Sequence, residues 1–274
     1  LARVDDVGRD DGGRGSGQMP PAAPAEITPV LQAVDQAREA FRSIGTVLRD
    51  HGLDRSGLFK SIRATEEELL ATPMALDVRV DGKTLAFSGG PGVGAISNQE
   101  DTVTWRSETV SAEGHRLEVG GHMEYDGMAR FDVALAPSKP LTVEGIELRI
   151  PYRPELLRLA NVGLTFGFMA IERSKDGVYS CEPIHWCWVK PDPRRRPGVL
   201  FDSRDACTAP ALSNQYPGRS WFAPYLQIGN NHRGLSWFAE NDRGWIHSPD
   251  GPPPWELVAR GDETFLRLNL VARS

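Results

Sequence analysis

Two carboxylates near the end of the 274-residue sequence have a spacing that suits hydrolysis of a glycosidic bond. That reaction uses two carboxyl groups roughly 5–10 Å apart. Glu240 and Asp242 are two residues apart, so in a continuous strand they would share one face at roughly 6–7 Å. The competing interpretation is a polar turn, in which Asp242 bonds to its own backbone and Gly244 supplies a positive φ. We expect the turn, and we assign no catalytic residue.

A second set of residues, aromatic and polar, indicates contact with sugar. Six of the seven Trp lie between Trp186 and Trp255, and the flat face of an indole can stack on the apolar face of a sugar ring. The candidate ligand-binding residues of this region are Trp186, Trp188, Trp221, Tyr225, Asn231, His232, Glu240 and Asp242. The pattern predicts carbohydrate as the ligand.

The competing interpretation places several of the same aromatic side chains in a core between two sheets. Trp221, Trp237 and Trp245 are the residues concerned. Trp237 alternates with Leu235 and Ala239, so these three side chains share one face of a strand. For Trp237 this alternation favours the core.

Motifs of other chemistries do not occur in the sequence. It contains no HExxH, His-x-His or CxxC pair, so we expect neither a metal nor a cofactor. Gly89–Gly94 lacks the Lys-Ser/Thr of a phosphate-binding loop and predicts a hairpin loop. The three cysteines are either small buried hydrophobic residues, or Cys181 and Cys187 close a short loop and leave Cys207 unpaired.

Composition limits the classes of partner. The 31 basic and 37 acidic residues give a net charge of −6. A binder of nucleic acid or of an anionic membrane needs a basic surface, so we expect neither partner. No apolar run reaches the ~20 residues of a membrane-spanning helix. The 28 Gly and 21 Pro suit a β-rich fold with many turns.

The N-terminal quarter of the chain predicts a linker followed by two helices. Residues 1–25 are polar and rich in Gly and Pro, which predicts a flexible linker. Over 26–73 we expect an α-helical hairpin. An apolar stripe from Ile27 to Leu48 has the period of a helix face, and a second helix is expected over Ser56–Leu70.

From residue 74 to residue 274 the apolar period changes from 3.6 to 2, which predicts a large antiparallel β-sandwich of supersandwich type. Between Gly163 and Tyr216 the alternation is weak, and we expect long loops with one strand at Ile184–Val189. The expected strands are Leu76–Val80, Val103–Val110, His115–Tyr125, Ala129–Leu135, Leu141–Ile150, Phe222–Ile228, Gly234–Glu240, Glu256–Ala259 and Thr264–Val271.

Two details of register follow from this pattern. The apolar residues of 117–125 and of 129–135 both fall at odd positions. The residue numbers of two opposed positions in a hairpin add up to a constant. The two sets therefore face each other only across a loop of odd length, such as Asp126-Gly127-Met128. In the next strand the apolar phase changes at Glu144-Gly145, which predicts a β-bulge.

The segment Trp221–Trp245, WFAPYLQIGNNHRGLSWFAENDRGW, resembles a segment of bacterial proteins related to glycoside hydrolase family 123. The resemblance covers the chain from Ile27 to its end, and its specificity comes from Gly229–Trp245 and Tyr125–Phe131. Three earlier segments resemble other strands of the same β-sandwich: Ala71–Lys83, Met123–Pro137 and Leu141–Glu155.

This resemblance implies a non-catalytic β-sandwich module of a secreted glycoside-hydrolase-like protein. Such a module supports a (β/α)₈ barrel and contributes to carbohydrate binding. In the family the catalytic Asp-Glu pair lies on the barrel and works with the N-acetyl group of the sugar, and no residue of this chain matches that pair. The implied location is extracellular or periplasmic. Because the sequence begins at Leu1, we expect either a removed leader or a piece of a longer protein.

Two other functions remain open at the level of sequence. One is a stand-alone carbohydrate-active supersandwich of the mutarotase or lyase type, for which His232 and Glu240 are the nearby candidates. The other is a structural subunit that assembles through the helical hairpin. The sugar, its linkage and the oligomeric state are not fixed by the sequence.

Overall fold

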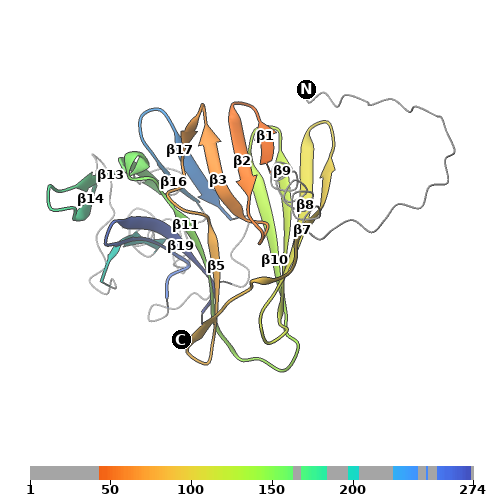
Figure 1. Cartoon of the computed structure of the whole chain (residues 1–274). Coiled ribbons are helices and arrows are strands. Elements are labelled where there is room, and N and C mark those ends of the chain that lie inside the picture. The colour runs from red at the N-terminus through yellow and green to blue at the C-terminus, as the bar shows by residue number, and fades with distance from the viewer. Residues whose placement is uncertain are drawn as a thin grey trace, which may run out of the picture. The chain divides into compact units, whose positions relative to one another are not determined.

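The computed structural model describes residues 43–162, 168–183, 197–203, 225–239, 245 and 252–272 (Figure 1). The chain divides into two compact units, Leu1–Phe41 and Arg42–Ser274, and every described residue belongs to the second. The predicted linker over 1–25 lies outside the described residues. The described elements are antiparallel strands and one short 3₁₀ helix, Pro154–Leu156 (η2). The prediction of a mainly β, antiparallel fold is confirmed.

The described strands form four sheets, which we number 1 to 4. Within Arg42–Ser274 their arrangement is propeller-like rather than a sandwich, so the predicted β-sandwich is wrong. Alternation along a strand shows which of its faces is buried. It does not show which strands share hydrogen bonds, and the sequence pattern therefore could not separate the four sheets.

Sheet 1 occupies the part of the chain where helices were predicted. Its four strands follow each other in the order of the chain. The predicted α-helical hairpin over 26–73 is therefore wrong over 43–73, and its first part lies outside the described residues. The strands are β1 (Ser43–Thr46), β2 (Arg49–Leu53), β3 (Phe59–Ala64) and β4 (Glu67–Glu68).

Contacts with sheet 2 explain why strands form here. The Phe59 ring lies 5.0 Å from the ring of Phe131 and 6.1 Å from that of Trp105. Burial of a large aromatic side chain outweighs the few tenths of a kcal/mol per residue by which local helix propensities differ. The β3–β4 turn is Thr65-Glu66, with φ values of 48° and 73°. Such turns favour Asn-Gly, so this one carries no recognisable sequence signal.

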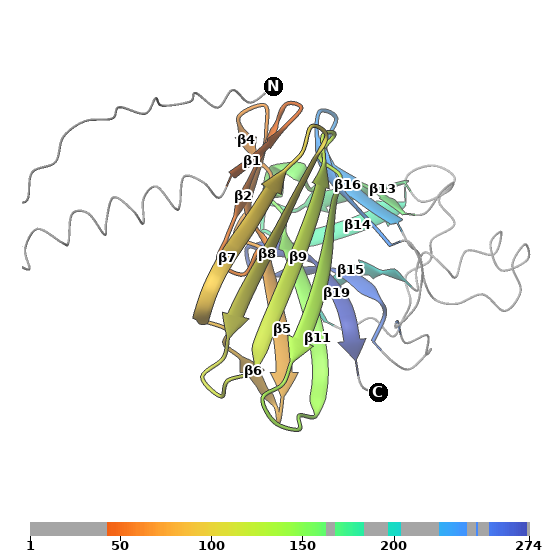
Figure 2. The ribbon, with the colours of Figure 1, turned by 90° about the vertical axis from the view of Figure 1, so that its right-hand side faces the viewer.

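Sheet 2 has the order β10-β9-β8-β7, and Figure 2 shows β7, β8 and β9 side by side. Val119 pairs with Val133 and Leu117 with Leu135, which confirms the predicted facing of the two apolar sets. The odd loop is Tyr125–Gly127, one residue earlier than expected. The strands are β7 (Gly89–Asn98), β8 (Thr102–Val110), β9 (Arg116–Glu124) and β10 (Ala129–Ala136). Gly89–Gly94 therefore lies in a strand and not in the predicted hairpin loop.

Sheet 3 has six strands in the order β15-β18-β19-β11-β5-β6. The register between β11 and β5 shifts between Val143 and Gly145, which confirms the predicted bulge. The strands are β5 (Ala75–Val80), β6 (Lys83–Leu85), β11 (Val143–Pro151), β15 (Val199–Asp202), β18 (Trp255–Arg260) and β19 (Glu263–Ala272).

Sheet 4 has five strands in the order β14-β13-β12-β16-β17. Two of them, β13 and β14, occupy a region where only loops were expected, and the strand expected at Ile184–Val189 lies outside the described residues. The strands are β12 (Leu159–Val162), β13 (Phe168–Arg173), β14 (Tyr179–Pro183), β16 (Tyr225–Gly229) and β17 (Gly234–Phe238).

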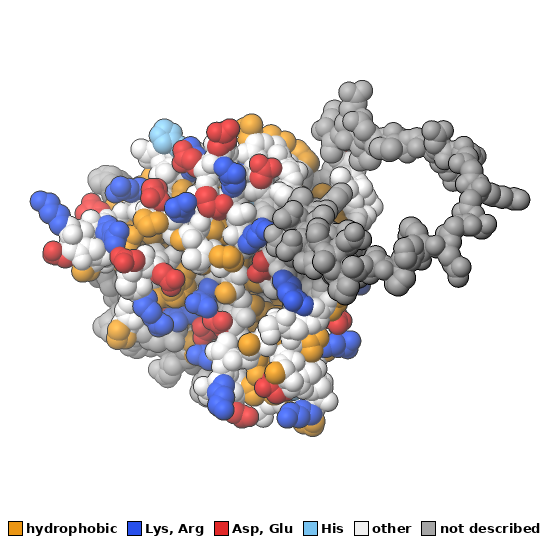
Figure 3. All heavy atoms as spheres, in the orientation of Figure 1, with side chains coloured by type: hydrophobic (Ala, Val, Ile, Leu, Met, Phe, Trp, Pro, Cys, Tyr) orange, Lys and Arg blue, Asp and Glu red, His pale blue; other side chains and the backbone are white. Residues whose placement is uncertain are grey.

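One hydrophobic core receives side chains from all four sheets. Leu53, Trp105, Leu268 and Ile228, one from each sheet, are at most 2% exposed. On the surface shown in Figure 3, acidic and basic side chains are interspersed. In the described part of the chain no helix is long and apolar enough to span a membrane.

Candidate functional site

The structure describes three of the eight predicted ligand-binding residues. Tyr225 begins β16, and Asn231 and His232 lie in the turn between β16 and β17. The turn is four strand residues beyond Tyr225, which is roughly 13 Å. The structure therefore does not bring Tyr225 together with Asn231 and His232. The other five predicted residues, which lie outside the described residues, are Trp186, Trp188, Trp221, Glu240 and Asp242.

The turn is held by hydrogen bonds within it and by contacts with two residues far away in the sequence. The Asn230 side-chain oxygen accepts hydrogen bonds from the backbone N–H groups of His232 (2.9 Å) and Arg233 (3.0 Å), and its amide donates to the Glu155 carbonyl (3.1 Å). The Arg233 guanidinium lies 2.9 Å from a carboxylate oxygen of Glu67 in sheet 1. These contacts fix the tip of the hairpin, and the Asn231 and His232 side chains are exposed on it.

The outer face of the β16–β17 hairpin carries aromatic and amide side chains. Tyr225 lies directly opposite Phe238, and Gln227 lies opposite Ser236. Phe238 is 49% exposed, and the Tyr225 hydroxyl donates a hydrogen bond to the Gln227 side-chain oxygen at 3.2 Å. On the neighbouring strand, Asn161 pairs with Gln227. We call these five residues the aromatic-amide face.

This face combines two kinds of contact that sugar recognition uses. A partly exposed aromatic ring offers a flat apolar surface, while amide and hydroxyl groups offer both donors and acceptors. Directly opposed residues have Cβ atoms roughly 4.5–5.5 Å apart, so the two rings and the two polar groups form adjacent pairs. Gln227, Phe238 and Asn161 were not among the predicted residues. The alternation of Tyr225 and Gln227 with buried Leu226 and Ile228 was the signal that could have found them.

The inner face of the same hairpin is packed by indole rings. Trp237 lies 6.2 Å from Trp245 and 6.5 Å from Trp255, and Trp255 lies 5.3 Å from Phe201 (ring centroids). The core interpretation is confirmed for Trp237 and Trp245. Because this cluster packs the inner face of the hairpin, the aromatic-amide face is directed away from the core.

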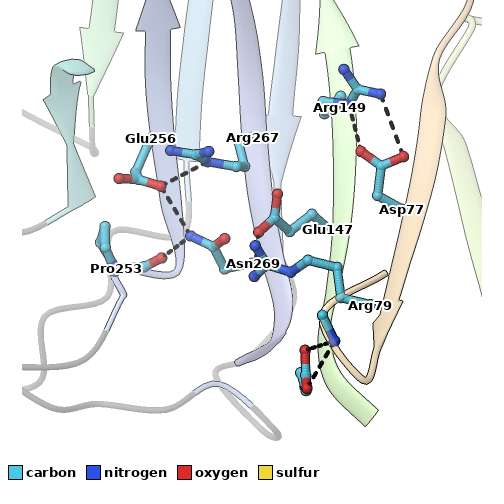
Figure 4. Close-up of polar contacts among 10 residues, drawn as sticks. Asp77, Arg79, Glu147, Arg149, Pro253, Glu256, Arg267 and Asn269 are labelled. Atoms are coloured by element: carbon cyan, nitrogen blue, oxygen red, sulfur yellow. Dashed lines mark hydrogen bonds and ion pairs between the residues drawn. The ribbon is translucent and has the colours of Figure 1, made fainter. Parts of the chain in front are cut away.

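A second polar region lies on sheet 3 and includes Glu256 (Figure 4). Asp202 on β15 lies opposite Glu256 in the register and is equally buried. Glu256 is fully buried. It accepts hydrogen bonds from Arg267 Nε at 2.9 Å and from the Asn269 amide at 3.2 Å. The same amide group donates to the Pro253 carbonyl at 2.6 Å. A buried charge requires this kind of compensation, because its desolvation is otherwise costly.

Two further carboxylates of this region, Glu147 and Asp77, are also paired with guanidinium groups. Arg79 lies 2.8 Å from Glu147, and Arg149 lies 2.9 Å from Asp77 (Figure 4). Hydrolysis of a glycoside needs one carboxyl group that donates a proton and another that acts as a base or nucleophile. Three carboxylates that are each held by a guanidinium suit a structural network better than that chemistry.

Metal ligands do not gather in the described residues: no three His, Cys, Asp or Glu side chains lie together as a metal site requires. Cys181 lies on β14 and is half-buried, and Cys187 and Cys207 fall outside the described residues. What the described residues offer is a surface for contact and a charge-compensated scaffold.

The fold and this surface define an antiparallel β-domain with an exposed aromatic-amide face. The family model described as "Glycoside hydrolase 123, third domain" matches residues 41–192. This match spans more than half of the chain, and the chain therefore belongs to that family. It covers the Tyr125–Phe131 motif and ends before the Gly229–Trp245 motif. No curated protein matches the chain. The family assigns the chain to the accessory domains related to glycoside hydrolases.

Proposed function

We propose that this chain is a carbohydrate-binding accessory module of a secreted bacterial protein, and that the aromatic-amide face contacts the sugar. Its partner in this proposal is the catalytic (β/α)₈ barrel of the parent protein, which carries the chemistry. The proposed location is extracellular or periplasmic. Fractionation of cells that produce the natural protein with an epitope tag tests this location, and tag found only in the cytoplasm would contradict it.

The observation that carries the proposal is the exposure of Phe238 opposite Tyr225, with Gln227 beside them, in a domain of a glycoside hydrolase family. A single exposed aromatic side chain is common, whereas adjacent ones form a patch that can meet a partner. Phe238 and Tyr225 lie directly opposite each other. The opposite face of the same hairpin is already packed by Trp237. The inner aromatic side chain, Trp237, therefore contributes to the core, whereas the outer ones, Tyr225 and Phe238, can contact a ligand.

A glycan array probed with the whole chain tests the proposal, because the sugar is not specified in advance. We expect binding to neutral glycans, and we expect Tyr225→Ala and Phe238→Ala each to reduce the signal at least about tenfold, or ~1.4 kcal/mol. Tyr125→Ala is a matched control, since Tyr125 is 64% exposed and lies in the β9–β10 loop. Loss of signal in the control but not in the other two variants would contradict the proposal.

A further inference from the structure

The outer face of sheet 2 contains a hollow of about 920 Å³ that the aromatic-amide face does not share. Figure 2 shows the strands of this sheet in front of the rest of the described unit. A volume of this size falls within the range of small-molecule sites, roughly 300–1,000 Å³. The hollow lies over β7, β8, β9 and β10, so a rigid sheet forms its floor.

The centre of the hollow is Gly120 on β9. The register places Gly120 between Arg106 on β8 and Asp132 on β10. A Cβ atom added at Gly120 would have Asp132 as its nearest neighbour, at 3.9 Å. On the same strand, Glu118 and His122 lie two residues away on either side, roughly 7 Å from Gly120. Four polar side chains therefore surround a floor of bare backbone.

The next residue, Gly121, makes this floor rigid from the other side. It lies between Trp105 and Phe131, whose rings meet edge to face at 5.8 Å. Trp105 is 2% exposed, and its indole N–H donates to the Gly57 carbonyl at 2.8 Å. The Trp105 ring fills the inner gap that Gly121 leaves, whereas the outer gap at Gly120 is open. A site whose floor is fixed before binding loses less entropy on binding.

The charges around the hollow select a neutral ligand. Arg106 is exposed and forms no ion pair within the described residues. Asp132 is paired with Arg130 at 2.9 Å, with both side chains about two-thirds exposed. Besides Arg106 and Arg130, three carboxylates line the hollow: Glu108, Glu118 and Asp132. Glu108 lies 3.7 Å from the guanidinium of Arg116, so three guanidinium groups and three carboxylates balance each other. An anion would meet the carboxylates and a cation would meet the guanidinium groups, so neither is favoured.

The same groups offer donors and acceptors at opposite sides of the hollow. Arg106 donates only, His122 donates or accepts, and the carboxylates of Asp132 and Glu118 accept. A sugar ring presents hydroxyl groups around its edge, and each hydroxyl both donates and accepts. We propose that the hollow around Gly120 is a second carbohydrate site, which binds a neutral hexose unit by its hydroxyl groups. The ligand class rests on the proposed function, but the residues are separate from the aromatic-amide face.

The test titrates the whole chain with methyl β-D-galactoside, methyl β-D-glucoside and methyl N-acetyl-β-D-galactosaminide, followed by saturation-transfer NMR. Sodium sulfate serves as the anionic probe. Gly120→Leu fills the hollow, and Arg106→Met removes the donor while keeping most of its bulk. Because the Gly120 side is open, we expect neither variant to lower the melting temperature of the parent chain. For at least one glycoside we expect each variant to weaken binding at least tenfold, and we expect no response to sulfate.

Other results would contradict either the second site or the aromatic-amide face. Unchanged glycoside affinity in Gly120→Leu, no binding of any of the three glycosides, or binding of sulfate in their place would overturn the inference. Loss of glycoside binding in Phe238→Ala but not in Gly120→Leu would leave the proposed function standing and remove the second site. Loss in Gly120→Leu but not in Phe238→Ala would support the second site and show that these glycosides do not bind to the aromatic-amide face.

Discussion

The two adjacent glycines of β9 lead to a sharp prediction about stability. Gly120 and Gly121 face opposite sides of sheet 2. A Cβ at Gly121 would overlap the indole ring of Trp105, whereas a Cβ at Gly120 has its nearest neighbour at 3.9 Å. Neither glycine has a positive φ, so alanine fits the backbone at both positions. The pair therefore separates crowding in the core from the general effect of replacing glycine in a strand.

The expected magnitude follows from the contacts of Trp105. Overpacking of a core costs roughly 1–3 kcal/mol. Displacement of the ring also breaks the hydrogen bond from its indole N–H to Gly57, and an unsatisfied buried donor costs roughly 1–3 kcal/mol. We expect Gly121→Ala to lower the free energy of unfolding by about 3–5 kcal/mol. For Gly120→Ala we expect a gain of up to about 1 kcal/mol, because alanine loses less entropy than glycine on folding.

Urea unfolding followed by tryptophan fluorescence measures both variants against the parent chain. The slope of free energy against urea concentration must stay the same for the comparison to hold. A difference of less than about 1 kcal/mol between Gly121→Ala and Gly120→Ala would refute the packing described for Trp105. It would also weaken the argument that the floor of the hollow is rigid.

Two further predictions concern buried charge. Arg267→Met leaves the fully buried Glu256 without its guanidinium and should cost about 3–5 kcal/mol of unfolding free energy. The control is Arg130→Met, which breaks an exposed ion pair and should cost less than about 1 kcal/mol. Equal losses of unfolding free energy in urea would contradict this prediction. Burial lowers the pKa of His51 below its usual value of 6.5. As the pH falls below that value, the unfolded chain takes up a proton that the folded chain resists, so stability declines by at most about 1.4 kcal/mol per pH unit. His51→Leu should flatten this part of the profile of unfolding free energy against pH, and an unchanged slope would show that His51 does not titrate as inferred.

The sequence predicted nine of the strands from residue 75 onward, because their burial is one-sided, but it missed β6, β7, β12, β13, β14 and β15. Alternating apolar residues located β8, β9, β10 and β11 to within about two residues at each end. It also predicted the facing of Val119 and Val133 and the bulge at Gly145. These features depend only on which face of a strand is buried, and the alternation of apolar and polar residues shows that face directly.

The N-terminal strands were not predictable in the same way. Leu48 was counted in a helical stripe, but it is 74% exposed in the β1–β2 turn, with a φ of 59°. Leucine at a positive φ carries no local signal for a turn. The buried positions Phe59 and Ile62 are three apart, a spacing that also suits a helix. Strands form here because Phe59 contacts Trp105 and Phe131, which are far away in the sequence.

The candidate site was predicted in part. Tyr225 lies on the aromatic-amide face, but Asn231 and His232 lie at the far end of the hairpin. The prediction treated residues that are close in the sequence as close in space. In a strand, however, each residue adds roughly 3.3 Å of separation. Phe238 comes near Tyr225 because the register of β16 and β17 opposes them. The register of a hairpin was therefore the information that the residue pattern lacked.

The proposed function requires that this domain bind carbohydrate through the aromatic-amide face. Isothermal titration with the strongest neutral glycan from the array, using the parent chain and the double variant Tyr225→Ala/Phe238→Ala, tests it most directly. We expect saturable binding by the parent chain and at least about a hundredfold loss of affinity in the double variant, with an unchanged melting temperature. Equal affinity in the two proteins, or no binding by the parent chain to any neutral glycan, would contradict it.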